Sequence, residues 1–160
     1  MNKEETYRYL DSHGVNYEIT EHSAVFNMEE LNSVLLAYPD RIAKNLFIRD
    51  DKKRNYYLIT IKGDKHVDLK QFRKTHALRS LTFASAEDLM TIMRLNPGSV
   101  TPLGLLNDEE RKITLYLDSA FGNGIVGVHP NDNTATVWLK AKDLMRIISE
   151  HGNPVEQTEL

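Results

Sequence analysis

Apolar side chains recur along the chain at two spacings, which separate predicted helices from predicted strands. Repeats of three to four residues predict helices, whereas strict alternation predicts half-buried strands. The predicted helices cover residues 2–13, 27–37, 68–76, 85–95 and 142–152. The predicted strands cover residues 15–22, 43–50, 55–62, 78–84, 112–118, 124–129 and 134–140. Strand pairs interleaved with helices favour one α+β domain over residues 1–160, built on a mainly antiparallel sheet rather than a doubly wound parallel one.

The fourth predicted helix has clear signals at its start and along one side. Ser85 is an N-cap residue, and Asp88 follows it at the spacing of a capping box. Leu89, Met90 and Met93 then fall on one side of the helix, which predicts that this side faces the core.

The strand predicted over residues 43–50 has a lysine in an apolar row. Lys44 stands between Ile42 and Leu46 on one face, while Asn45 lies on the other face. Lysine is rarely buried without a partner. Lys44 therefore either extends along the rim of the core towards solvent or points into a functional site, and alternation alone leaves both readings open.

Composition excludes several classes of protein. The chain has 160 residues, of which 41% are hydrophobic and 27% charged, as in a soluble globular domain. It has no cysteine, which excludes disulfides, thiolate zinc sites and a cysteine nucleophile. The polar N-terminus and the absence of an apolar run near ~18 residues predict a cytoplasmic protein without a membrane partner.

Charge is distributed unevenly around a net value of −3. Residues 1–30 carry two basic and seven acidic side chains, whereas residues 62–79 carry six basic and two acidic ones. The second segment is either a solvated helix face or a patch that attracts phosphate. If the segment binds a nucleic acid such as tRNA, the candidate binding residues are Lys62, Lys65, Lys70, Arg73 and Lys74.

Catalytic motifs are few. None of the six histidines has the spacing of a helical metal motif, and both the G-x-S-x-G elbow and the phosphate-binding loop are missing. A metal-dependent phosphodiesterase using His66, Asp68 and His129 would need ligands that the spacing does not cluster. His129 ends a predicted strand, where a structural and a functional role are equally compatible with the pattern. The segment 98–104 could present backbone N–H groups to an anionic oxygen.

Five segments together resemble a known family. The segments "EHSAVFNMEE", "AKNLFIRD", "YYLITIKGDKHVDLK", "GSVTPLGLLND" and "VGVHPNDNTATVWL" are similar to the freestanding YbaK-type prolyl-tRNA editing family, in particular to its branch acting on alanyl-tRNA(Pro). The resemblance implies a single α+β domain with a mixed, barrel-like sheet surrounded by helices. It also implies an enzyme without metal or cofactor that hydrolyses, in trans, the ester between a wrong amino acid and the acceptor end of tRNA(Pro).

The resemblance also implies roles for individual residues. Lys44 would contact the acceptor end and orient the ester, and the loop starting at Gly98 would supply N–H donors to the ester carbonyl, so these two are the candidate catalytic residues. His22 would lie at the entrance of the amino-acid pocket. The candidate substrate-binding residues are His22, Asn45, Ser99, Val100, Thr101, Pro102 and His129.

Specificity and partners are predicted less sharply. The pair Lys44-Asn45 favours alanine over the cysteinyl-tRNA(Pro) branch, which lacks it, while Leu103 replaces an expected aromatic residue and would change the floor of the pocket. The rival class is a non-catalytic module that binds aminoacyl-tRNA or a synthetase. Partners beyond tRNA(Pro) could include prolyl-tRNA synthetase or an elongation factor.

Overall fold

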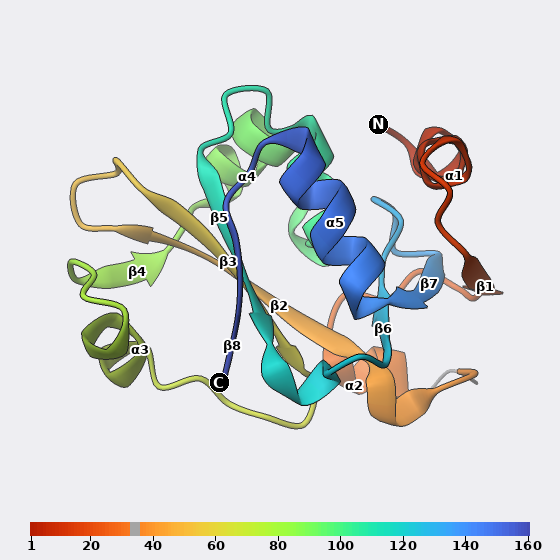
Figure 1. The fold of residues 1–160 in the computed structure, drawn as a ribbon, viewed down its shortest axis with the longest axis horizontal. Helices are drawn as coiled ribbons and strands as arrows, with labels where there is room; N and C mark the ends of the chain where they lie inside the picture. Colours follow the sequence, from red (N-terminus) through yellow and green to blue (C-terminus); the bar gives the residue numbers. More distant parts are fainter. Residues whose placement is uncertain (33–35) are drawn as a thin grey trace.

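Two β-sheets and the helices around them make up the fold of residues 1–32 and 36–160, the part of the chain that the computed structural model describes (Figure 1). The α-helices are α1 (Lys3–Ser12), α2 (Met28–Asn32), α3 (Leu69–Thr75), α4 (Ala86–Met93) and α5 (Ala141–His151). The strands are β1 (Tyr17–Glu21), β2 (Ala43–Asp50), β3 (Tyr56–Lys62), β4 (Leu81–Phe83), β5 (Ile113–Asp118), β6 (Ile125–Val128), β7 (Ala135–Lys140) and β8 (Val155–Thr158). Short 3-10 helices cover Pro39–Arg41, Pro97–Ser99, Pro102–Asn107 and Ser119–Phe121.

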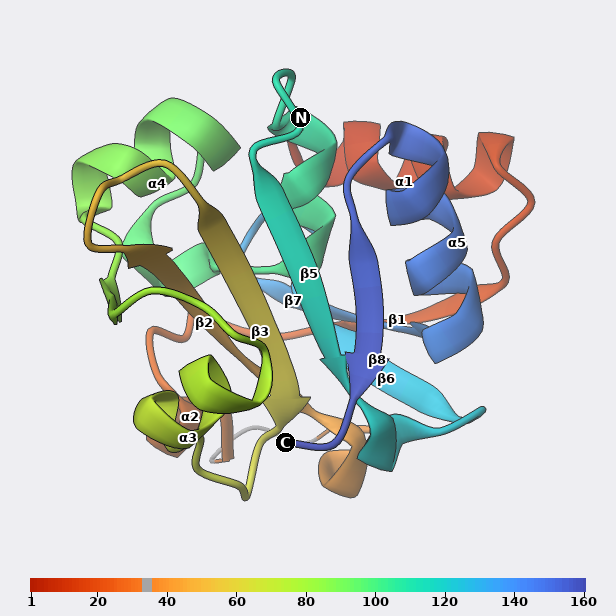
Figure 2. The same cartoon turned by 60° about the vertical axis from the view of Figure 1, so that its left-hand side comes forward.

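The larger sheet has the strand order β4-β2-β3-β5-β8, and β2, β3, β5 and β8 lie side by side in Figure 2. Its β2–β3 and β2–β4 pairs are antiparallel, whereas β3–β5 and β5–β8 are parallel. The smaller sheet, β1-β7-β6, is antiparallel throughout. The predicted α+β class with a mixed, mainly antiparallel sheet is confirmed. Barrel-like closure is not confirmed, because neither sheet closes on itself within the described residues and only one bridge, Ile42 to Gly127, links them.

Both faces of the larger sheet are buried, and α3 and α5 lie on opposite sides of it (Figure 1). Phe72 of α3 packs on the face that includes Ile48 and Tyr116. Leu144 of α5 packs on the other face, in the cluster that contains Phe47. Successive residues of β2 therefore enter two different apolar clusters, which explains why its sequence is apolar in both registers.

Most predicted elements are confirmed, with three differences. The second helix, predicted over residues 27–37, is described only as Met28–Asn32. Residues 33–35 of the prediction lie outside the described residues, and residues 36 and 37 are not helical. The capping box of Ser85 and Asp88 is confirmed, but the prediction that Met90 faces the core is wrong: Met90 is exposed and Ile92 is buried in its place. The strand β8 has no counterpart in the prediction, because its short segment is mostly polar and pairs at long range with β5.

Gly127 on β6 lies opposite Trp138 of β7, whose indole leaves no room for a side chain at this position. Replacing Gly127 therefore tests how tightly the smaller sheet is packed. A Cβ atom added at Gly127 would lie 2.4 Å from Cζ3 of Trp138. The indole cannot retreat, because it is buried and its Nε1 donates to Oγ1 of Thr20 at 2.9 Å. We expect Gly127→Ala to lower the free energy of unfolding by about 2 kcal/mol, measured by urea denaturation.

Gly98→Ala is the matched control for this prediction. Its added Cβ would lie 2.6 Å from Cδ1 of Phe26, whose side chain is exposed and free to move. The expected change is within about 0.5 kcal/mol. Equal stability losses in the two variants would contradict the assigned role of Trp138.

Candidate functional site

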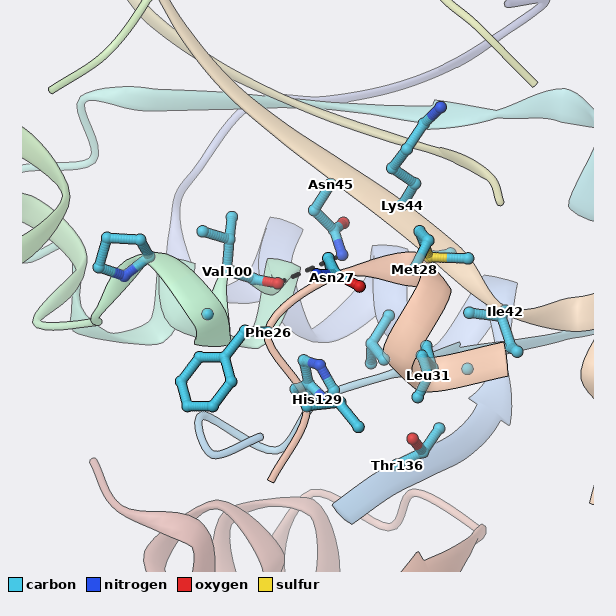
Figure 3. Close-up of a pocket in the computed structure, with 16 residues that line it drawn as sticks. Phe26, Asn27, Met28, Leu31, Ile42, Lys44, Asn45, Val100, His129 and Thr136 are labelled. Atoms are coloured by element: carbon cyan, nitrogen blue, oxygen red, sulfur yellow. Dashed lines mark hydrogen bonds between the residues drawn. The ribbon is translucent and has the colours of Figure 1, made fainter. Parts of the chain in front are cut away.

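The pocket lies beside the first half of β2, where the larger sheet leaves room for it. The edge strand β4 pairs only with residues 48–50 of β2, and the pocket opens beside the residues that precede them. Its cavity volume is about 140 Å³ (Figure 3). Side chains reach it from the segment leading into α2, from α2 itself, from β2, from the 3-10 helix Pro97–Ser99 and from the end of β6. The residues that define it are Phe26, Met28, Leu31, Ile42, Lys44, Asn45, Gly98, Val100, His129 and Thr136.

Lys44 lines the pocket, but its ammonium group turns outwards. Figure 3 shows the side chain pointing away from the ring of His129. Its Nζ donates a hydrogen bond to the backbone oxygen of Lys65. No ion pair with a carboxylate is found for Lys44 among the described residues. The ammonium therefore lies at the outer side of the pocket, with a neutral partner that an anionic group could replace.

Asn45 points into the pocket from the opposite face of β2 and is fixed at both ends of its amide. Its Oδ1 accepts a hydrogen bond from Oγ1 of Thr60 at 2.7 Å, which orients the amide. Its Nδ2 then donates to the backbone oxygen of Val100 at 3.4 Å (Figure 3). The pair Lys44-Asn45 thus places a positive charge and a fixed amide on two sides of one strand.

The segment 98–102 divides into residues that line the pocket and residues that support it. Gly98 and Val100 line the cavity. Thr101 is buried, and its Oγ1 donates to the backbone oxygen of His129 at 2.6 Å. Pro102 is buried at the start of a 3-10 helix, and Ser99 is absent from the lining. Of this loop, the predicted catalytic residue Gly98 and one of the four predicted substrate-binding residues, Val100, line the pocket.

Two backbone N–H groups of this segment have no partner within the described residues. The amide of Ser99 is used within the turn, since it donates to the oxygen of Asn96 at 2.9 Å. For the amides of Gly98 and Val100, the described residues provide no acceptor. The amide of Gly98 lies in the first turn of the 3-10 helix Pro97–Ser99, where N–H groups lack a partner within the helix, and the amide of Val100 directly follows that helix. An N–H group without an acceptor suits an oxygen with negative charge.

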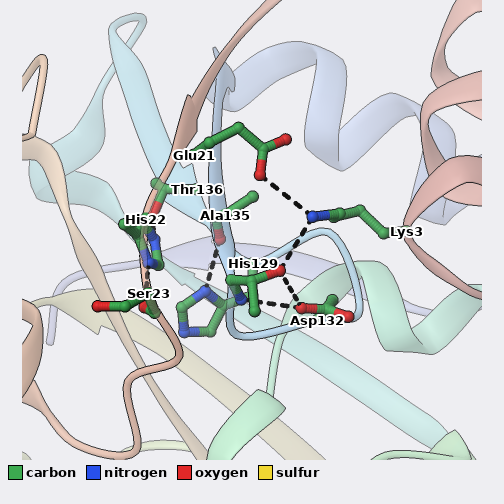
Figure 4. A network of polar contacts seen from close by, with 9 residues as sticks. Lys3, Glu21, His22, Ser23, His129, Asp132, Ala135 and Thr136 are labelled. Atoms are coloured by element: carbon green, nitrogen blue, oxygen red, sulfur yellow. Dashed lines mark hydrogen bonds and ion pairs between the residues drawn. The ribbon is translucent and has the colours of Figure 1, made fainter.

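His129 closes the inner side of the pocket with its tautomer fixed. Nδ1 lies 2.9 Å from the backbone oxygen of Ala135 (Figure 4). A carbonyl only accepts, so Nδ1 carries the proton and the neutral ring leaves Nε2 as an acceptor. Burial lowers the pKa of His129 below its usual 6.5, and the neighbouring His22 acts in the same direction. The site therefore holds a neutral imidazole with a lone pair.

His22, the residue directly after β1, lies close to His129. Its ring centroid lies 6.2 Å from that of His129. Nδ1 of His22 lies 2.9 Å from the backbone oxygen of Ser23, and Nε2 lies 3.0 Å from Oγ1 of Thr136 (Figure 4). His22 does not line the cavity itself but orients Thr136, which does.

In the basic segment, residues 62–79, the side chain of Lys65 forms contacts within the protein. Nζ of Lys65 forms an ion pair with the buried carboxylate of Asp118 at 3.1 Å and also donates to the oxygen of Leu160. Lys70 and Lys74 are exposed on α3, whereas Arg73 is half-buried. Lys62 lies at a hollow that shares Met28 and Ile42 with the pocket.

Several lining residues were not singled out from the sequence. Phe26, Met28 and Leu31 reach the pocket from α2 and the segment before it. The motif "EHSAVFNMEE", on which the resemblance rests, contains Phe26 and Met28, so it was the signal that could have identified them. Leu103, predicted to alter the pocket floor, is instead fully buried in the main core.

The residues considered for a metal are not brought together. His66 and Asp68 line a separate hollow beside α3, whereas His129 lines the pocket described above. Within residues 1–32 and 36–160, no group of three His, Cys, Asp or Glu side chains could hold a metal ion. The described helices are also too short or too polar to cross a membrane.

Comparisons with known proteins agree on one family. A family model described as "Aminoacyl-tRNA editing domain" matches residues 22–147. The prolyl-tRNA editing protein ProX of Acetoanaerobium sticklandii is 39% identical over 152 residues, which cover 94% of this chain and 93% of that protein. The prolyl-tRNA synthetase associated domain-containing protein 1 of Mus musculus is 32% identical, over 90% of this chain and 88% of that protein.

A solved structure shares the fold of this chain. A crystal structure of a proposed trans-editing enzyme for prolyl-tRNA synthetase superposes with a TM-score of 0.74 and 20% sequence identity, covering 100% of this chain and 98% of that one. At this identity the comparison establishes the fold alone.

Proposed function

The chain belongs to the aminoacyl-tRNA editing domain family, and we propose that it hydrolyses the ester of mischarged alanyl-tRNA(Pro) in trans. The family activity is that of a trans-editing aminoacyl-tRNA deacylase, which is a hydrolase. The observation that carries the proposal for alanine is the small pocket, whose inner wall combines apolar side chains with the neutral ring of His129.

A second sieve explains why such a pocket is useful. A synthetase that accepts proline cannot strongly exclude alanine, because a difference of a few methylene groups is worth only ~1–3 kcal/mol. An editing pocket can admit the alanyl side chain and exclude the larger prolyl ring by size. The apolar wall that includes Leu31 and Ile42 is the part of the pocket that would make this selection, by its shape around the amino-acid side chain.

The chemistry needs positioning more than a protein nucleophile. An aminoacyl ester is already activated, so holding it beside a water molecule and stabilising the oxyanion can supply the rate enhancement. The amides of Gly98 and Val100 are suited to the oxyanion. The ammonium of Lys44, which can leave the oxygen of Lys65, is suited to a phosphate or ester oxygen at the mouth of the pocket.

The amino-acid end would be recognised by the inner wall. Nε2 of neutral His129 can accept a hydrogen bond from the α-ammonium group of the alanyl residue. Asn45, fixed by Thr60, shapes the side wall between β2 and Val100. Thr101 and His22 act through these groups, since they position His129 and Thr136.

The tRNA would approach over the basic segment. Lys44 leaves β2 on the face that α3 covers and contacts the backbone of Lys65, so its ammonium adjoins this segment. The exposed cations Lys70 and Lys74, with the partly exposed Lys62 and Arg73, would attract the acceptor stem. Lys65 would contribute little to this attraction, because Asp118 neutralises its charge. A complex with prolyl-tRNA synthetase is part of the proposal, because a relative is named as associated with that enzyme.

A deacylation assay tests the proposed substrate. We expect the wild-type protein to hydrolyse labelled alanyl-tRNA(Pro) at least about tenfold faster than cysteinyl- or prolyl-tRNA(Pro). Faster loss of the cysteinyl ester would assign the protein to the cysteinyl branch. Hydrolysis of all three esters at their spontaneous rates would instead identify a binding module without catalytic activity.

A further inference from the structure

A second hollow beside the pocket has an exposed aromatic wall. It is lined by residues of β2, β4, the start of α4 and the turn before Val100, with a cavity volume of about 200 Å³. Phe83, the last residue of β4, stands in this wall with 60% of its surface exposed. Most of the other contributors are apolar, including Leu46, Phe47 and Leu89.

The exposure of Phe83 is not general for this chain. Three of its five phenylalanines are buried. The two exposed ones, Phe26 and Phe83, each line one of the two adjoining hollows. Exposed aromatic side chains beside a binding pocket are more informative than a scattered apolar residue, because burying them against a ligand removes apolar surface from water.

The second hollow adjoins the pocket. Asn45, Pro97 and Val100 line both cavities, so the two share a wall. A ligand whose reacting group lies beside Gly98 can therefore extend over Pro97 and Val100 towards Phe83. The ester substrate has such an extension, because the ribose that carries the amino acid also carries a nucleobase.

We propose that the hollow at Phe83 binds an unpaired nucleobase from the 3′ end of the tRNA, stacked on the phenyl ring. The inference rests on the proposed function and names a subsite for the part of the substrate that does not react. Unpaired bases are recognised by stacking on aromatic side chains, and such stacking tolerates any base because every base has a π-face. The apolar surroundings of Phe83 favour a planar base over a phosphate, which would need cations.

The test uses a probe that cannot be hydrolysed, so that its outcome does not depend on catalysis. The probe is a short single-stranded RNA ending in CCA, whose terminal ribose carries alanine through an amide. The protein has one tryptophan, Trp138, which is 2% exposed, so a tryptophan introduced at the surface reports separately from it. We expect the probe to quench the added fluorescence of Phe83→Trp but not that of Met90→Trp, whose site on α4 is exposed and outside both hollows.

Binding and kinetics then measure the contribution of the ring. Phe83→Ala should weaken binding of the probe about tenfold, and Met90→Ala should leave it unchanged. The same loss is expected in kcat/KM for alanyl-tRNA(Pro), but not for an alanyl ester of methyl riboside, which has no base. Unchanged probe binding by Phe83→Ala, or equal quenching in the two tryptophan variants, would overturn the subsite. If wild-type protein binds the probe but does not deacylate, the proposed function fails while the subsite stands.

Discussion

Replacing Lys44 with alanine is expected to lower kcat/KM for alanyl-tRNA(Pro) about 10- to 100-fold, the scale of losing one charge-assisted hydrogen bond to a substrate oxygen, which is worth ~1.5–3 kcal/mol. The physical reason is the position of its ammonium, at the edge of the pocket with only a backbone carbonyl as partner. In this arrangement the charge remains available to the substrate. The measurement is single-turnover deacylation of labelled alanyl-tRNA(Pro) with enzyme in excess.

Lys52→Ala is the control for charge and for the amino-acid change. Lys52 is exposed in the turn that joins β2 to β3, away from the pocket. The Lys52→Ala variant should hydrolyse alanyl-tRNA(Pro) at the wild-type rate. Lys52→Ala should keep the wild-type urea midpoint. Lys44→Ala loses the partly buried hydrogen bond to the oxygen of Lys65 and should lower the free energy of unfolding by at most about 1.5 kcal/mol. If Lys44→Ala deacylates as fast as Lys52→Ala, the assignment of Lys44 is wrong even though the family is established.

The position of Lys44 illustrates what alternation along a strand can predict. The sequence placed a charge on an apolar face of β2, and the pocket beside that strand confirms that the position adjoins a cavity. The direction of the ammonium could not be predicted, because it depends on the backbone of Lys65, a contact formed only after β2 and β3 have paired.

The segment 98–102 shows the same limit for a loop. Gly98, Pro102 and Gly104 predict an ordered connection in this region, and the structure forms two 3-10 helices, Pro97–Ser99 and Pro102–Asn107. Which residues face the pocket depends on how those turns pack, because Thr101 is turned inwards to hold the backbone of His129. A spacing motif alone cannot separate such a supporting residue from its neighbours Gly98 and Val100.

Counting charges along the sequence does not show which cations are available to a ligand. Residues 62–79 were correctly identified as basic, but the count treats every cation as free. Lys65 is paired with Asp118, a carboxylate more than 50 positions away in sequence at the end of β5. Long-range ion pairs of this kind are fixed by sheet topology, here by the parallel pairing of β3 with β5.

Activity is expected to fall at acidic pH through protonation of His129. The proposed role of its ring needs the neutral form, with the proton on Nδ1 and a free lone pair on Nε2. Burial lowers the pKa of His129 below 6.5, because the charged form loses hydration. The neutral form therefore persists below pH 6.5, and kcat/KM should stay constant there until the pH reaches the lowered pKa. Below that pKa, kcat/KM should fall about tenfold for each pH unit.

The substrate does not produce this acidic limb itself, since its α-amino group is already protonated at these pH values. His129→Gln separates the two groups, because glutamine retains an acceptor but does not titrate. We expect this variant to be slower than the wild type near neutral pH. Its kcat/KM should not change between about pH 4.5 and 6.5, a range that extends about two pH units below the ordinary histidine pKa. An NMR titration of the histidine ring signals should give the same pKa as the activity profile. A limb that persists in His129→Gln, or one that begins at 6.5 or above, would exclude His129 as the group that titrates.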